Sequence, residues 1–176
     1  FPLSDRSVTR LVNDPSDVHS ISGHRVSCLL GDRDNTLWAG TGRGLNEYLP
    51  LNQSFAAQIR LRGTVSRIWI DSGSGPRRYY VASTYGDGLV ELDAAFRRIH
   101  TWPSVPFGAA DKDNRQVLDL LRTRNGTLWV ATFNGLYRYD SDTRSFRGFP
   151  RDAPAGQRPA SVHLTALVED TAGRQI

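Results

Sequence analysis

The four histidines are the residues best suited to metal or acid–base chemistry, yet their positions favour neither. His19, His24, His100 and His163 lie in different parts of the chain. No His-x-x-x-His or Cys-x-x-Cys spacing accompanies them, so no two ligands are held ready for one metal ion. We therefore expect no metal site and no metal cofactor.

Other catalytic patterns are also missing. The sequence has no Gly-x-Ser-x-Gly turn to expose a serine nucleophile. The glycine-rich segment GTGRGL resembles a phosphate-binding loop, but it joins two expected strands and no helix follows it. Asp32, Asp71 and Asp170 recur at one repeat position, which favours a role in turns over a glycosidase pair. The sequence thus predicts no catalytic residues and no cofactor.

The composition indicates a globular protein that does not bind nucleic acid. The 176 residues are 39% hydrophobic and 23% charged, with a formal net charge of +4. The arginines come as scattered pairs such as Arg60 and Arg62, which we expect to be solvated, with no basic stripe or stacking aromatics beside them. Cys28, the only cysteine, is expected to be a small buried residue.

Nothing in the composition indicates a segment that spans or crosses a membrane. No apolar run approaches 18 residues, and no signal peptide is recognisable. The sequence also contains no methionine, which suggests an excerpt or a processed form of a longer protein.

An internal repeat organises the chain. The segment TLWAGTGRGLNEY, beginning at Thr36, recurs as TLWVATFNGLYRY, beginning at Thr127. Apolar runs precede both copies, and two weaker copies complete a series that starts near residues 26, 65, 117 and 164. Such a period is the signature of repeat architectures in which neighbouring units share their cores.

Each repeat reads as four short strands joined by tight turns. Short apolar runs such as VSCLL are of strand length, and Asn125-Gly126 is typical of a hairpin turn. Four antiparallel strands in about 45 residues match one blade of a β-propeller. We therefore predict an all-β fold spanning residues 1–176, with about three complete blades and partial blades at both ends. Residues 7–12 are expected to form an outer strand, and residue 164 to begin an inner strand.

The repeated aromatic residues are expected to be structural. Trp38, Tyr80 and Trp129 occupy one strand position in successive units. A large side chain repeated once per blade packs against the next blade, so both tryptophans should be mostly buried.

The repeats resemble the two-component regulator propeller family. Its pattern, loosely D-x-x-G-x-L-W-x-G-T-x-x-G-L-x-x-Y-D, is similar to LLGDRDNTLWAGTGRGLNEY and LLRTRNGTLWVATFNGLYRYD. Thr123, Asn35 and Ala131 depart from it at structural positions. The resemblance implies the periplasmic, ligand-sensing part of a bacterial receptor, usually a hybrid histidine kinase or a diguanylate cyclase receptor with a GGDEF output domain.

The variable loops are the candidate binding site. In a propeller the turns between second and third strands open on the same face as the connections that enter each inner strand. These positions carry Arg43, Tyr85, Asp87, Phe133, Asn134, His24, Arg115 and His163. Such a mixture suits a small polar molecule, an oligosaccharide or a peptide, although ordinary exposed loop residues would look the same.

Two alternatives to ligand sensing stay open. Enzymes built on propellers gather unlike charged groups around the axis, whereas the inner strands here are mostly apolar, with Arg67 and Asp119 as exceptions. This favours binding over lyase or glycosidase activity but does not separate sensing from a protein–protein scaffold. The open blade edges also suggest a homodimer.

Overall fold

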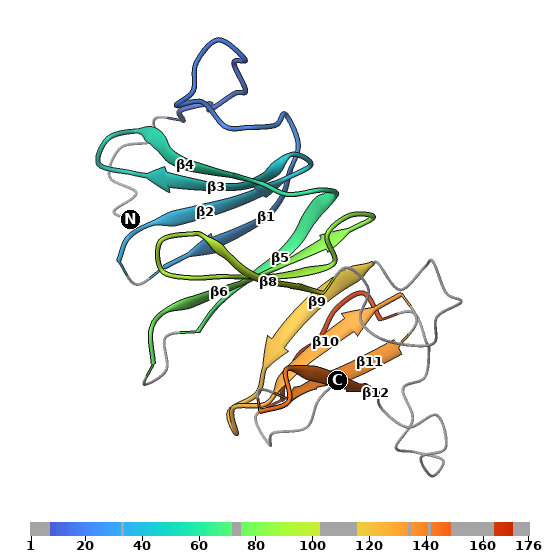
Figure 1. Cartoon of the computed structure of the whole chain (residues 1–176). Coiled ribbons are helices and arrows are strands. Elements are labelled where there is room, and N and C mark those ends of the chain that lie inside the picture. The colour runs from blue at the N-terminus through green and yellow to red at the C-terminus, as the bar shows by residue number, and fades with distance from the viewer. Residues whose placement is uncertain are drawn as a thin grey trace.

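The computed structural model describes residues 8–32, 34–71, 75–102, 116–133, 135–140, 142–148 and 164–170. In this part of the chain, strands form three separate four-stranded antiparallel sheets and no helix occurs. The sheets follow one another as blades of a fan (Figure 1). The predicted all-β fold with three complete blades is confirmed.

Each blade is an up-and-down meander whose strands follow chain order. The first blade contains β1 (Val26–Gly31), β2 (Leu37–Thr41), β3 (Gly44–Leu49) and β4 (Ser54–Arg60). The second contains β5 (Thr64–Asp71), β6 (Arg78–Thr84), β7 (Leu89–Leu92) and β8 (Arg98–Trp102). The third contains β9 (Val117–Arg122), β10 (Leu128–Thr132), β11 (Gly135–Asp140) and β12 (Ser145–Gly148).

The turns adopt the backbone conformations that their residues favour. Asn35 and Gly126 have positive φ angles of 61° and 87° in the turns between first and second strands. Gly44, at the start of β3, has φ 135°, and a side chain there would overlap the carbonyl oxygen of Ile59 in β4. The close approach of β3 and β4 therefore requires glycine at this position.

Neighbouring blades share apolar cores. Between the first and second blades, the Trp38 ring lies 5.2 Å from the Tyr79 ring and 5.0 Å from the Phe96 ring. Between the second and third blades, Tyr80 lies in a cluster with Trp102 and residues of the third blade. The facing sides of consecutive described blades therefore cover each other, as in other repeat folds.

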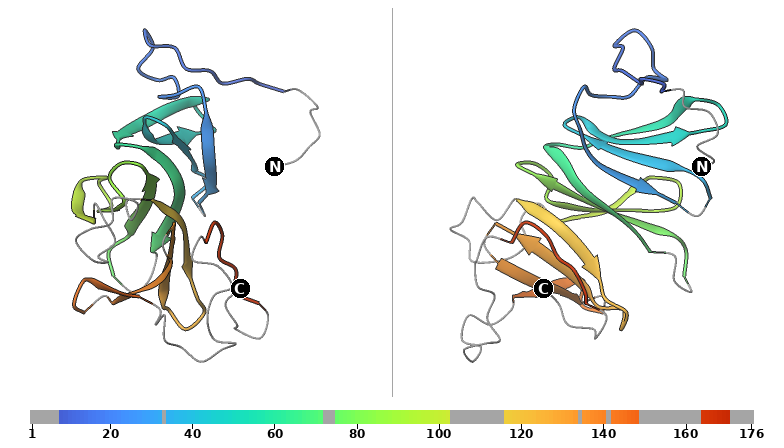
Figure 2. Two further views of the ribbon diagram at one scale, coloured as in Figure 1. Left: turned by 90° about the vertical axis from the view of Figure 1, so that its right-hand side faces the viewer. Right: turned by 180° about the vertical axis from the view of Figure 1, so that it is seen from behind.

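Trp38 and Trp129 occupy equivalent positions but are not equally buried. Trp38 is 1% exposed and Trp129 has intermediate exposure, so both side chains are mostly buried, as predicted, with Trp129 less so. Its strand neighbours Leu128 and Val130 pack against the second blade, so alternation turns Trp129 to the opposite face. Beside the third blade on that side, the described residues supply only the segment 164–170 (Figure 2).

The two predicted terminal strands are not formed. Residues 8–12 are irregular, and residues 164–170 contain a single bridge residue, Glu169. The outer edge of the first blade is instead paired by the connection before β1, where the Phe55 amide donates to the His19 carbonyl at 3.0 Å. A homodimer stays a prediction, but residues 8–12 offer no outer strand for two copies to share.

Candidate functional site

One end of the three blades forms the candidate binding rim. Val26 pairs with Thr41, and Val117 pairs with Thr132, so the start of each inner strand lies beside the end of the second strand. The turns that follow β2, β6 and β10 therefore sit next to the connections that enter β1, β5 and β9. We call this end of the blades the rim.

The structure places the described candidate residues on the rim with different degrees of exposure. Tyr85 is 78% exposed and has a φ of 59°, and His24 and Arg43 are exposed. Phe133 is half-buried, and its amide donates to the Gln116 carbonyl at 3.2 Å. Asn134, Arg115 and His163 lie outside the described residues.

Asp87 joins two segments of the rim by hydrogen bonds. Its Oδ2 accepts hydrogen bonds from the Arg62 amide and from Arg98 Nη2, both at 3.0 Å, and its side chain is only 12% exposed. The Asp87 amide donates in turn to the Arg62 carbonyl at 3.1 Å. This carboxylate fastens the β6–β7 turn to the connection between the first two blades, and it is poorly placed to meet a ligand.

A groove of about 720 Å³ lies on the rim of the first blade. We call it the rim groove. One wall is the connection at residues 13–22, and the other is formed by the β2–β3 turn, the end of β4 and the connection into β5. Its polar and charged lining residues are Asn13, Asp14, Asp17, Ser20, Ser22, Arg43, Gln58, Arg60 and Arg62.

Hydrogen bonds across the rim groove fix its shape. Gln58 Nε2 donates to the carbonyls of Val18 and Ser20 at 3.1 and 2.5 Å. Asn13 Nδ2 donates to the Ile21 carbonyl at 2.7 Å, and Ile21 is buried against the first blade. The connection is therefore attached to the blade by side-chain bonds and by apolar contact.

Two of the groove arginines were not identified as site residues from the sequence. Arg60 and Arg62 read as a solvated pair, because nothing in the local pattern shows that the preceding connection folds back against β4. The only sequence signal is their place at the end of the fourth strand, just before the connection into the next blade. Arg43 alone was both predicted and found in the groove.

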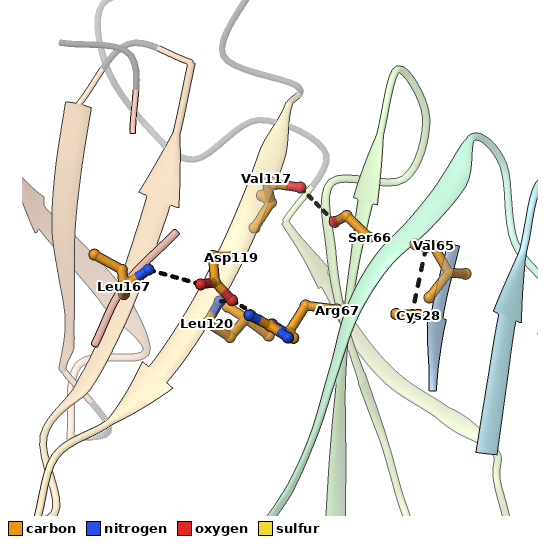
Figure 3. Close-up of polar contacts among 8 residues, drawn as sticks. All are labelled: Cys28, Val65, Ser66, Arg67, Val117, Asp119, Leu120 and Leu167. Atoms are coloured by element: carbon orange, nitrogen blue, oxygen red, sulfur yellow. Dashed lines mark hydrogen bonds and ion pairs between the residues drawn. The ribbon is translucent and has the colours of Figure 1, made fainter. Parts of the chain in front are cut away.

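The charged residues on the inner strands are engaged with each other. Arg67 Nε on β5 donates to Asp119 Oδ1 on β9, and Asp119 Oδ2 accepts the Leu167 amide at 2.7 Å (Figure 3). The Asp119 side chain is 1% exposed. Ser66 Oγ also donates to the Val117 carbonyl at 2.7 Å. These contacts link consecutive inner strands, which is a structural role.

The described part of the chain contains no group of metal ligands, no membrane-spanning helix and no readily ionised thiol. No group of three or more His, Cys, Asp or Glu residues there could hold a metal ion. The described residues likewise contain no helix with the length and apolar character needed to cross a membrane. Burial raises the pKa of the Cys28 thiol to about 11, so it is protonated at neutral pH and a poor nucleophile.

One family model matches parts of this chain. The family model of the two component regulator propeller matches residues 20–43 and 111–134. Among the described residues, these segments contain the first two strands of the first blade, β1 and β2, and of the third blade, β9 and β10. A search of curated proteins finds no match.

Solved structures share the fold at low sequence identity. The extracellular domain of the putative one component system BT4673 from B. thetaiotaomicron is 19% identical, with a TM-score of 0.65. The match covers 88% of this chain and 20% of that one. The extracellular domain of the putative hybrid two component system BT3049 from the same organism is 13% identical, with a TM-score of 0.65. That match covers 95% of this chain and 27% of that one.

The chain thus spans about a quarter or less of these two domains. The two repeated hairpins, which begin at Thr36 and Thr127, each begin inside a segment that the family model matches. Two segments of the chain match the two component regulator propeller model, and the chain folds as consecutive four-stranded blades similar to those extracellular domains.

Proposed function

We propose that this chain is part of a ligand-sensing module of a bacterial signalling receptor. The module lies outside the cytoplasm, in the periplasm, and binds its ligand without turnover. The output is a hybrid histidine kinase or a cyclic-di-GMP pathway. Support comes from the regulator propeller repeats and from the similarity to extracellular domains of B. thetaiotaomicron signalling systems.

The rim groove is the observation that carries this proposal. It combines a volume of about 720 Å³, suited to a small molecule, with walls that hydrogen bonds hold in place. By contrast, Arg67 and Asp119 on the inner strands bind each other, and Asp119 also accepts the Leu167 amide. Binding on the rim therefore has a built site, whereas catalysis at the axis has none among the described residues.

A protein–protein scaffold is the second candidate. Tyr85 favours it, because an aromatic side chain that is 78% exposed on the rim is typical of a contact with a protein partner. The two functions predict different effects for single substitutions. Tyr85→Ala should abolish capture of a protein partner, whereas Arg43→Ala should abolish binding of a small molecule.

The test is a calorimetric screen of the purified chain with monosaccharides, short oligosaccharides and dipeptides, followed by mass spectrometry of any bound compound. Sensing predicts a compound that binds, is recovered unchanged, and loses affinity with Arg43→Ala. Arg97→Ala is the matched control, because Arg97 is 80% exposed and pairs with Asp93 in the β7–β8 turn. Chemical conversion of the compound, or equal binding by both variants, would overturn the proposal.

A further inference from the structure

Three arginines converge on the blade side of the rim groove. Arg43 comes from the β2–β3 turn, Arg60 from the end of β4, and Arg62 from the connection into β5. Gly44 pairs with Arg60 across the sheet, so the turn and the strand end are neighbours. Two segments, the β2–β3 turn and the end of β4 with the connection that follows it, thus bring three arginines to one wall.

The main chain fixes the base of each arginine. The Arg43 amide donates to Thr41 Oγ1 at 3.1 Å, and Arg60 belongs to the β3–β4 ladder. The Arg62 amide and carbonyl both bond to Asp87, at 3.0 and 3.1 Å. Their guanidinium groups therefore start from fixed points, which reduces the ordering that a ligand would have to impose.

The charges of these arginines are not neutralised within the described residues. Eight other arginines pair with carboxylates within 4.0 Å, at positions 67, 77, 78, 97, 98, 122, 124 and 147. No such pair involves an arginine of the groove in this part of the chain. In a protein where most described arginines find a carboxylate, three without one on the same wall form an anion-binding surface.

The opposite wall offers acceptors for hydroxyl groups. Asp14 Oδ1 accepts the Ser16 amide and hydroxyl at 2.9 and 2.7 Å, and these bonds lower the pKa of the carboxyl, so it is ionised at neutral pH. Asp17 Oδ1 accepts the His19 amide at 2.8 Å. Each carboxylate has a second oxygen that can accept a hydrogen bond from a ligand.

We propose that the rim groove binds a hydroxyl-rich small molecule that carries a carboxylate or sulfate, of the chemical class of acidic sugars. The arginine wall takes the anionic group in forked hydrogen bonds, and the aspartate wall takes hydroxyl groups. The inference rests on the proposed function, since it names the ligand class of the same site.

The first experiment measures affinity by calorimetry for glucuronate, glucose 6-sulfate, glucose and inorganic sulfate. We expect both acidic sugars to bind, glucose to bind at least tenfold more weakly, and inorganic sulfate to bind more weakly than the sulfated sugar. Affinity should fall as salt rises from 50 to 500 mM, because exposed charges are screened. If glucose binds as well as glucuronate, the anionic requirement is wrong. If inorganic sulfate binds as well as glucose 6-sulfate, the hydroxyl contacts are wrong.

The second experiment assigns the site with Arg60→Gln and Arg62→Gln. Each should weaken glucuronate binding at least tenfold, with Arg60→Lys restoring part of it, since lysine keeps the charge but loses the fork. Arg97→Gln should have no effect. Because the groove arginines are exposed, thermal unfolding should not change, and the salt dependence of the unmodified protein gives a readout that needs no variant. Unchanged affinity in both Gln variants would overturn the site.

The outcomes also separate this inference from the proposed function. Binding of a neutral compound that Arg43→Ala abolishes would keep the sensor and overturn the anionic ligand. Binding of glucuronate that never alters the output of the receptor in cells would keep the site and overturn sensing.

Discussion

Removing Asp119 should destabilise the contacts between consecutive inner strands. The carboxylate is 1% exposed and accepts from three donors: Arg67 Nε, the Leu120 amide at 2.8 Å and the Leu167 amide at 2.7 Å. Asp119→Ala leaves both amides without this acceptor, and each lost partner of a buried amide costs about 1–3 kcal/mol. The Arg67 side chain is 47% exposed and can return to water, so losing the ion pair adds about 1 kcal/mol or less.

We therefore expect Asp119→Ala to lower the free energy of unfolding by about 3–5 kcal/mol, a large share of the 5–15 kcal/mol typical of a domain. Asp119→Asn keeps one acceptor oxygen and should cost about half as much. Arg67→Met removes the cation but keeps both amide bonds to the carboxylate, so it should cost about 2–3 kcal/mol, less than the ~3–5 kcal/mol for breaking a fully buried pair, because Arg67 is half exposed.

Urea denaturation followed by tryptophan fluorescence measures these differences as shifts of the midpoint at constant slope. Hydrogen exchange at the Leu167 amide supplies a local readout, because Asp119→Ala should accelerate exchange there more than in β2. Arg97→Ala is the control, since an exposed ion pair is worth about 0.2–1 kcal/mol. A loss below 1 kcal/mol for Asp119→Ala, with unchanged exchange at Leu167, would refute the reasoning.

Three further predictions follow from burial. Trp38→Ala should cost about 3–5 kcal/mol and the less buried Trp129→Ala about half of that, and iodide quenching of variants that keep only Trp38 or only Trp129 can check the burial independently. Gly40→Ala should cost about 1–3 kcal/mol in urea denaturation, because its methyl group would lie 2.9 Å from Val65 Cβ and collide with Cys28 Sγ. Since the pKa of Cys28 is raised from 9.0 to about 11, the folded state keeps its proton longer, so stability should fall between pH 9 and pH 11. Iodoacetamide should accordingly modify the folded chain at pH 8 about a hundredfold more slowly than the chain in urea, and equal rates would show that the thiol is not buried.

The blade pattern could be predicted from the sequence because its determinants are local. Apolar runs of strand length, an Asn or Gly with positive φ in the turn, and a period of about 45 residues together fix the four-stranded meander. The difference in burial between Trp38 and Trp129 could not be predicted in this way. Its local sequence matches that of Trp38, but Trp38 is covered by Tyr79 and Phe96, which belong to the next blade.

The rim was predictable in outline and the rim groove was not. Repeat positions place Arg43 and Tyr85 at equivalent turns, and strand register brings those turns beside the inner-strand connections. The groove, however, exists because Gln58 binds the main chain of residues 18 and 20, some 40 residues earlier. Asp87 was predicted as a ligand residue because the sequence does not show its partners. Only the fold brings Arg98 and the Arg62 amide to its carboxylate.

The recurring aspartates show why a repeat position can mislead about its own role. The sequence assigned Asp32 and Asp71 to turns within their blades. In the structure Arg77 Nη1 lies 3.2 Å from Asp32 Oδ2, and Arg122 Nη1 lies 2.6 Å from Asp71 Oδ1. Each aspartate therefore also forms an ion pair with an arginine of the following blade. A repeated charge at the end of a blade therefore marks the contact to the next blade. Among the described residues, Arg43, Arg60 and Arg62 combine a place in the rim groove with no such ion pair, which leaves their charges available to a ligand.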